Sequence, residues 1–236
     1  MPTLLRLDRI IAGTGLYSRS EAATLIKTGR VVVGDRTVSQ GAEKFDPDSD
    51  KILIDGSELC YRKFRYIMMN KPIGYVSSTN DRREKTVIDL LDIKYKKLGL
   101  FPAGRLDKDA EGLLLLTNDG ELSHNITSPV KRVSKKYFVQ VDEAITNEDI
   151  AAFAGGLKLG DGTKCLPAIL EPAPGGAFVT ICEGKYHQVK RMMAVIGKPV
   201  KYLKRIAIGG LILDESLQSG EYCEINDEIS LVLIDK

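Results

Sequence analysis

The chain has 236 residues, of which 43% are hydrophobic, enough for one large domain or two modest domains with real cores. Its formal net charge is only +2, so any attraction to a polyanion must come from local basic clusters. No apolar run could span a bilayer and no leader is recognisable, so we expect a cytoplasmic protein that makes no membrane contact. The four scattered cysteines form no Cys-x-x-Cys pair, which favours reduced thiols and no metal site.

The first 58 residues predict two helices followed by a small sheet. Apolar residues at helical spacing indicate a first helix over residues 4–13. Ser18 and Glu21 form a capping box that opens a second helix, and Gly29 stands where a helix C-terminal glycine is expected. Strands are predicted at residues 30–33 and 51–54.

The charge of this N-terminal segment is uneven. Residues 1–36 have a balance of +3, whereas residues 37–58 have a balance of −4. The helix pair therefore presents a basic face, which suits a nucleic-acid backbone because each neutralised phosphate releases condensed counterions. An ordinary solvated helix surface is the alternative, and charge alone does not decide between them. The basic residues of this face are Arg6, Arg9, Arg19, Lys27 and Arg30.

Residues 59–65 are polar and basic and predict a linker, and residues 66–236 predict a second domain. Helices are expected over residues 147–154, with Thr146 as the N-cap, and over residues 187–195. The combination predicts an α+β fold with a largely antiparallel sheet. The strand patterns of this domain lie at residues 66–69, 137–141, 177–181 and 231–234.

A short turn stands out within the second domain. Arg105 and Asp107 lie two residues apart in Gly-Arg-Leu-Asp, between apolar runs at residues 98–103 and 113–116. If both runs are buried strands, the turn between them is rigid and can direct a carboxylate at a bound substrate. An exposed surface pair or an N-cap is the alternative.

Four segments of the second domain together resemble one enzyme family: residues 70–75, 104–107 with 111–120, 135–137, and 183–192. Taken in this order, behind the basic N-terminal segment, they resemble the RsuA-type pseudouridine synthases, which act on small-subunit (16S) ribosomal RNA. The N-terminal segment resembles their alpha-L RNA-binding domain. The resemblance covers essentially the whole chain.

The resemblance implies a cofactor-free isomerisation of uridine to pseudouridine in RNA, with Asp107 as the catalytic aspartate. Whether this carboxylate attacks the sugar, attacks the base or takes up a proton is left open. Lys190 matches the basic position that pairs with the aspartate. Some relatives have arginine there, and the adjacent Arg191 is the second choice.

Further roles follow from the resemblance. Tyr137 matches the aromatic residue that lies against the flipped base, and Val189 would form an apolar floor beside it. Both could equally be core residues. Arg105 and Lys71 are expected to contact RNA phosphate or to hold the flipped nucleotide. For His187 a structural hydrogen bond is favoured over acid–base chemistry.

Basic clusters surround these segments and are expected to position RNA through its phosphates, although scattered solubilising residues are the alternative. We expect a monomer whose partner is ribosomal RNA or an assembly intermediate. A synthase of large-subunit (23S) RNA and a non-catalytic assembly factor that binds RNA are the rival hypotheses. The cluster residues are Arg62, Lys63, Arg65, Lys131, Arg132, Lys135, Lys136, Lys198, Lys201, Lys204 and Arg205.

Overall fold

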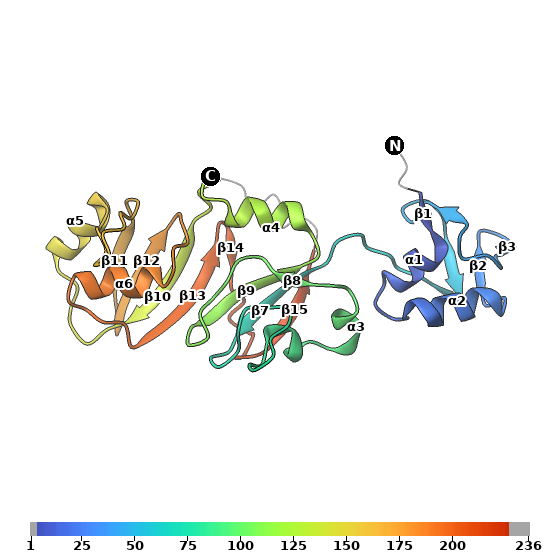
Figure 1. Cartoon of the computed structure of the whole chain (residues 1–236), viewed down its shortest axis with the longest axis horizontal. Helices are drawn as coiled ribbons and strands as arrows, with labels where there is room; N and C mark the ends of the chain where they lie inside the picture. Colours follow the sequence, from blue (N-terminus) through green and yellow to red (C-terminus); the bar gives the residue numbers. More distant parts are fainter. Residues whose placement is uncertain (1–3, 227–236) are drawn as a thin grey trace. The chain divides into compact units, whose positions relative to one another are not determined.

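The computed structural model of the chain describes residues 4–226, so the predicted strand at residues 231–234 lies outside the described residues. The chain divides into two units (Figure 1). The first comprises residues up to Phe64 together with Leu91–Leu100, and the second comprises Arg65–Leu90 and the residues from Phe101 onward. The domain limits inferred from the sequence stay a prediction. None of the described helices is long and apolar enough to cross a membrane.

The first unit contains the predicted helix pair and small sheet. The first helix begins at Leu7 rather than at residue 4, because Leu5 and Arg6 pair with a strand. The capping box is confirmed: Ser18 Oγ accepts from the Glu21 amide, and Glu21 accepts from the Ser18 amide. The elements are β1 (Leu5–Arg6), α1 (Leu7–Ala12), α2 (Arg19–Lys27), β2 (Val31–Val33), β3 (Arg36–Thr37), β4 (Lys44–Phe45), β5 (Ile52–Ile54), β6 (Ser57–Glu58) and α3 (Ile93–Lys96).

The second unit is built on one sheet of mixed orientation (Figure 1). Its strand order is β11-β12-β10-β13-β9-β7-β15, with β14 on β13 and β8 on β9. Only the β13–β9 pair is parallel among the described strand pairs. The strands are β7 (Tyr66–Lys71), β8 (Phe101–Pro102), β9 (Glu111–Thr117), β10 (Lys135–Gln140), β11 (Ile169–Ala173), β12 (Gly176–Ile181), β13 (Tyr202–Ile208), β14 (Leu211–Ile212) and β15 (Tyr222–Ile225).

Within the described residues, four helical elements accompany this sheet. The capping box at Thr146 and Asp149 starts α5 as predicted, and α6 begins one residue later than expected, at Gln188. Helix α4, whose N-cap is Asp119, was not among the predicted helices. The elements are η1 (Val87–Leu90, a 3-10 helix), α4 (Gly120–Thr127), α5 (Asn147–Gly155) and α6 (Gln188–Val195).

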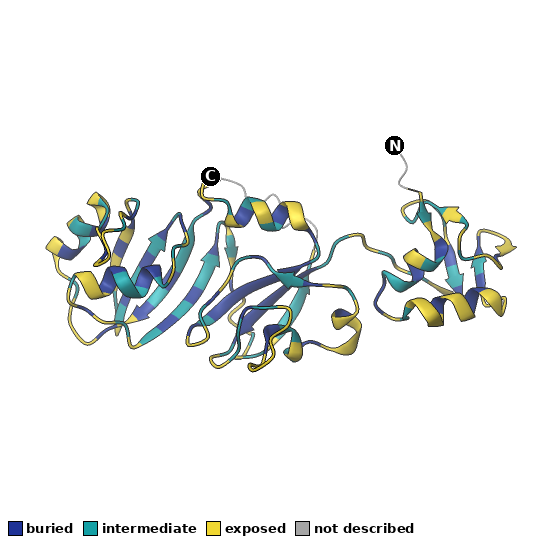
Figure 2. Ribbon diagram, viewed as in Figure 1, coloured by how far each residue is buried: buried dark blue, intermediate teal, exposed yellow. Residues whose placement is uncertain are grey.

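The central strands β7 and β9 are buried along almost their whole length (Figure 2). All four leucines of the run at residues 113–116 are completely buried, as expected of a strand covered on both faces. The run at residues 98–103, in contrast, yields only the short strand β8. Gly99 has a φ of 66°, a left-handed conformation that interrupts an extended chain.

The turn between β8 and β9 is fixed by a buried lysine at the end of β7. Lys71 is completely buried, and its Nζ donates to the carbonyl oxygens of Pro72, Asp107 and Ala110 at 2.9–3.0 Å. Ser77 Oγ donates to the Leu106 carbonyl and accepts from the Leu106 amide. The expected contact of Lys71 with RNA is therefore wrong, because its ammonium is enclosed by the turn that it supports.

A second buried cation supports the same turn from β13. Arg205 is 3% exposed; its Nε donates to the Leu113 carbonyl at 2.8 Å and its Nη1 to the Arg105 carbonyl at 3.3 Å. Its expected phosphate contact is therefore also wrong. Lys71, Gly112, Arg205 and Tyr137 occupy one row across β7, β9, β13 and β10. Residues paired in this way share a face of the sheet, so the row places both cations beneath the turn.

We predict that Gly112→Ala lowers the free energy of unfolding by about 2 kcal/mol or more. Gly112 has a φ of 108°, and a Cβ atom there would lie 2.2 Å from the Arg205 carbonyl oxygen. Gly120→Ala is the control, because a Cβ at Gly120 meets open space and its φ is not left-handed. Urea denaturation should show a large loss for the first variant and little change for the second; equal stabilities would contradict this account.

We predict that Lys71→Met destabilises the protein by on the order of 2–4 kcal/mol, because three carbonyl oxygens lose their donor. The loss should depend on pH. Burial lowers the pKa of Lys71 from 10.5 to about 8. At a pH between these two pKa values, Lys71 is still protonated in the unfolded chain but has released its proton in the folded protein. The contribution of Lys71 to the free energy of unfolding therefore rises with pH.

The measurement is urea denaturation of both proteins between pH 7.5 and about 10. The wild-type free energy of unfolding should gain up to about 1.4 kcal/mol per pH unit relative to Lys71→Met. Lys164→Met, at an exposed position of the same unit, should track the wild type. Parallel pH profiles for wild type and Lys71→Met would refute the buried-ammonium assignment.

Candidate active site

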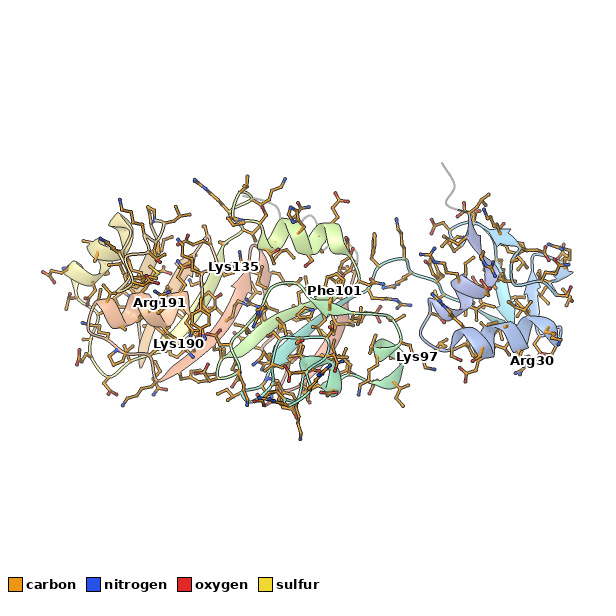
Figure 3. All side chains as sticks on the ribbon, viewed as in Figure 1. Arg30, Lys97, Phe101, Lys135, Lys190 and Arg191 are labelled. Atoms are coloured by element: carbon orange, nitrogen blue, oxygen red, sulfur yellow. The ribbon has the colours of Figure 1, made fainter. Side chains whose placement is uncertain are left out.

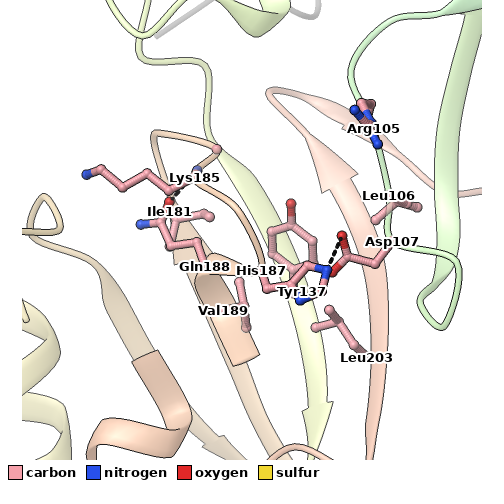
Figure 4. A pocket seen from close by; sticks show the side chains of 11 residues that line it. Arg105, Leu106, Asp107, Tyr137, Ile181, Lys185, His187, Gln188, Val189 and Leu203 are labelled. Carbon is pink, nitrogen blue, oxygen red and sulfur yellow. Dashed lines mark hydrogen bonds and ion pairs between the residues drawn. The ribbon is translucent and has the colours of Figure 1, made fainter. Parts of the chain in front are cut away.

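A pocket of about 80 Å³ opens where three of the four singled-out segments meet (Figure 4). The Gly-Arg-Leu-Asp turn forms one side, β10 and its neighbouring strands form the floor, and the start of α6 forms the other side. Segment 70–75 does not line the pocket and instead supports the turn through Lys71. The lining residues are Arg105, Leu106, Asp107, Tyr137, Ile181, Gly184, Lys185, His187, Gln188, Val189 and Leu203.

Asp107 presents its carboxylate to this pocket. Its Oδ1 lies 3.4 Å from His187 Nε2, and the two side chains are 29% and 37% exposed (Figure 4). The contact is an ion pair only when the imidazole is protonated. His187 has a left-handed backbone with a φ of 47°, an uncommon conformation for a residue other than glycine. His187 is the N-cap residue of α6, and its imidazole lines the pocket.

Lys190 has a different partner from the expected one. Its Nζ lies 2.5 Å from Asp109 Oδ1, and this ammonium lowers the pKa of Asp109 below its usual value. The structure thus shows a Lys190–Asp109 pair where the sequence predicted Lys190–Asp107. Successive residues of an α-helix diverge by about 100°, and Lys190, the residue after Val189, does not line the pocket.

Arg191 likewise has partners other than Asp107. Its Nη2 lies 2.5 Å from Asp161, and its Nη1 donates to the Tyr186 carbonyl at 3.3 Å. Both Lys190 and Arg191 lie on α6 (Figure 3). The second choice for the cation beside Asp107 is therefore also paired elsewhere.

Tyr137 and Val189 supply the apolar part of the pocket. They are 8% and 4% exposed, and both line it. The two interpretations weighed from the sequence are thus compatible, because each side chain is mostly buried and still offers a surface to the pocket. Arg105, in contrast, is exposed at the pocket and has its carbonyl held by Arg205. Its guanidinium remains at the surface.

Glu183 was not among the predicted site residues, but it organises the loop before α6. Only 8% exposed, it accepts hydrogen bonds from the Leu166 amide, Gln188 Nε2 and Lys185 Nζ. Burial opposes its ionisation, yet these hydrogen bonds prevail and lower the pKa of Glu183. The signal in the sequence was an acidic residue just before a helix start, which is too common to single out.

The N-terminal basic residues are exposed, as a phosphate-binding face requires. Arg6, Arg9 and Arg19 line a hollow of about 280 Å³ together with Asp8, which pairs with Arg6 at 2.6 Å. Lys27 ends α2, and Arg30, just beyond it, pairs with Asp55 at 2.5 Å (Figure 3).

Five further members of the expected basic clusters have ion-pair partners, and Lys198 and Arg65 are the least exposed of them. Lys198 is 8% exposed and pairs with Asp149 at 2.9 Å, so its expected phosphate contact is wrong. Arg65 pairs with Glu224 at 2.6 Å, joining the chain entering β7 to β15. These cations stabilise the second unit rather than forming an open surface.

The pocket therefore combines a carboxylate, an imidazole and an apolar wall. A carboxylate in this setting can serve as a nucleophile or a general base toward a ligand that comes within about 3 Å. The flat side chain of Tyr137 suits a planar ring as the ligand.

Comparison with known proteins agrees with this chemistry. Residues 65–195 match the family model described as RNA pseudouridylate synthase. The chain is 43% identical over 229 residues to the uncharacterized RNA pseudouridine synthase YtzG of Bacillus subtilis, covering 95% of this chain and 96% of that protein. It is 42% identical over 231 residues to ribosomal small subunit pseudouridine synthase A of Escherichia coli, covering 95% and 97%.

A solved structure agrees as well. The crystal structure of a pseudouridylate synthase superimposes with a TM-score of 0.68 at 38% sequence identity, and the match covers 98% of this chain and all of the other. The matched region includes the turn with Asp107, strand β10 with Tyr137 and the loop with His187. The chain belongs to the RNA pseudouridylate synthase family.

Proposed function

We propose that this protein isomerises one uridine of small-subunit (16S) ribosomal RNA to pseudouridine, with Asp107 as the catalytic carboxylate. The observation that carries the mechanism is the placement of Asp107 in a pocket with Tyr137 and Val189. The choice of small-subunit RNA is supported by the name of the Escherichia coli relative, which matches this chain over 95% of its length.

The reaction requires the target base to leave its stack and enter the pocket. Extruding a nucleotide costs a few kcal/mol, and stacking on an aromatic face returns about 1–3 kcal/mol. We assign that face to Tyr137 and the apolar contact beside it to Val189. The exposed Arg105 is suited to hold a phosphate of the same nucleotide.

The chemistry is an isomerisation and needs no atoms from a cofactor. The bond from the ribose to the base nitrogen breaks, the uracil turns, and a bond to a base carbon forms. The proton displaced from that carbon is balanced by one at the freed nitrogen. Asp107 is the group that we assign to act on the nucleoside, and Lys190 contributes a cation to the turn through Asp109.

Recruitment of the RNA is assigned to the N-terminal unit, which we propose to be an alpha-L type RNA-binding domain. The five exposed basic residues on and beside its helix pair, Arg6, Arg9, Arg19, Lys27 and Arg30, are suited to phosphate contacts that fix register without reading sequence. Members of the same family could act on large-subunit RNA, and the distinction depends on which RNA this unit recruits.

We predict that cells lacking the gene lose pseudouridine at a single 16S position, and that the wild-type gene restores it whereas Asp107→Asn does not. The amide keeps the size of the side chain but removes the charge and the basic oxygen. In purified form Asp107→Asn should lower the single-turnover rate at least about 100-fold with little loss of RNA affinity.

Asp142→Asn is the matched control, because Asp142 pairs with Lys201 on the surface of the same unit. It should behave as the wild type in cells and in single turnover. Loss of a 23S position instead of a 16S position would overturn the assigned target, and an active Asp107→Asn enzyme would overturn the assigned mechanism.

We predict that the double variant Arg9→Gln/Arg19→Gln binds 16S RNA more weakly and with a shallower salt dependence. The slope of log affinity against log salt should drop by about 1 for each lost phosphate contact. The single-turnover rate on saturating RNA should be unchanged. Lys44→Gln/Lys51→Gln, in the acidic half of the same unit, is the charge-matched control; equal salt slopes in the two double variants would contradict the recruiting role.

A further inference from the structure

Tyr186 is the most exposed aromatic residue near the pocket, although it stands between two residues that line it. It is 76% exposed, whereas Lys185 and His187 on either side both belong to the pocket wall. Its ring stacks on the His187 imidazole, with ring centroids 3.9 Å apart and an angle of 16° between the planes. The imidazole in turn lies 3.4 Å from Asp107.

The backbone that carries Tyr186 is anchored on both sides. Arg191 Nη1 donates to the Tyr186 carbonyl, and the Lys185 amide donates to Gln188 Oε1 at 2.9 Å. Lys185 Nζ also donates to the Lys164 carbonyl at 2.7 Å. These bonds hold the backbone, and the stack on His187 orients the ring without burying it, so that ordering the ring on ligand binding costs little conformational entropy.

This arrangement has the features of a stacking platform. One ring face is occupied by His187, and the exposed fraction leaves much of the remaining aromatic surface open to solvent. A fixed, exposed aromatic surface is one on which a planar π system can stack. Because Tyr186 lies at the rim of the pocket, a group that stacks on it must belong to the part of the ligand that extends out of the pocket.

We propose that Tyr186 stacks against the RNA base next to the target uridine. The inference rests on the proposed function, in which the pocket receives that uridine. Extrusion of one nucleotide leaves its neighbour without a stacking partner, and the neighbour is held at the rim by the backbone. Every base has a π face, so the platform strengthens binding without selecting sequence.

A role limited to orienting His187 is the competing explanation, and RNA design separates the two. The test uses a stem-loop containing the mapped uridine, with natural, 5′-abasic or 3′-abasic flanks. Tyr186→Leu should weaken binding of the natural stem-loop about tenfold and leave the single-turnover rate at saturating RNA unchanged. Tyr186→Phe, which keeps the aromatic face, should behave as the wild type.

The decisive comparison is between the 5′-abasic and the 3′-abasic stem-loops, each bound by the wild type and by Tyr186→Leu. With one of the two abasic stem-loops the difference between wild type and Tyr186→Leu should disappear, and 2-aminopurine at that flank should be quenched by wild type and Tyr186→Phe only. Unaltered binding by Tyr186→Leu, or a defect that persists on both abasic stem-loops, would overturn the platform.

The outcomes also separate this inference from the proposed function. A wild-type protein that forms no pseudouridine in the stem-loop would refute the proposed function, and an active Asp107→Asn variant would refute the mechanism assigned to it. An active wild type that is indifferent to Tyr186 would refute only the platform.

Discussion

The structure of the pocket depends on one buried ammonium group. Lys71 is completely enclosed and donates to three carbonyl oxygens, two of which belong to the residues Asp107 and Ala110 of the turn. Removing a cation from water is costly, and an enclosed ammonium is tolerated only when its protons are accepted. The buried ammonium group fixes the backbone of Asp107, the residue that we assign to catalysis.

The sheet explains how this group reaches its place. Lys71, Gly112 and Arg205 lie in one row across three neighbouring strands, and the row continues to Tyr137 on β10. Two cations of the row hold carbonyl groups of the turn, and the tyrosine lines the pocket beside it. A single register therefore sets the distance between the carboxylate and the aromatic wall. Preorganisation of this kind reduces the reorganisation that the reaction itself requires.

Local features were predictable because their signals are local. The capping box at Ser18 and the N-cap at Thr146 start helices as expected, and the leucine run 113–116 forms a buried strand. The resemblance to a known family indicated Asp107, Tyr137 and Val189 as site residues, and the three residues line one pocket. The same motifs indicated a pseudouridine synthase, and the comparisons confirm the RNA pseudouridylate synthase family.

Other features depend on partners far away in the sequence. In the sequence Lys71, Lys198 and Arg205 resemble ordinary surface cations, and only the fold shows that all three are buried. The pairing of Lys190 with Asp109 depends on the direction in which α6 projects each side chain, which a motif does not specify. His187, which lies beside Asp107, has a left-handed backbone, and the sequence does not indicate this conformation.

The most direct test of the central claim is a crystal structure of the Asp107→Asn protein bound to an RNA stem-loop that contains the target uridine. We expect the uracil beside Tyr137 and Val189, the substituted side chain at position 107 within about 3–4 Å of the nucleoside, and the turn still bonded to Lys71. A uridine bound outside this pocket, or a turn released from Lys71 in the complex, would contradict the claim.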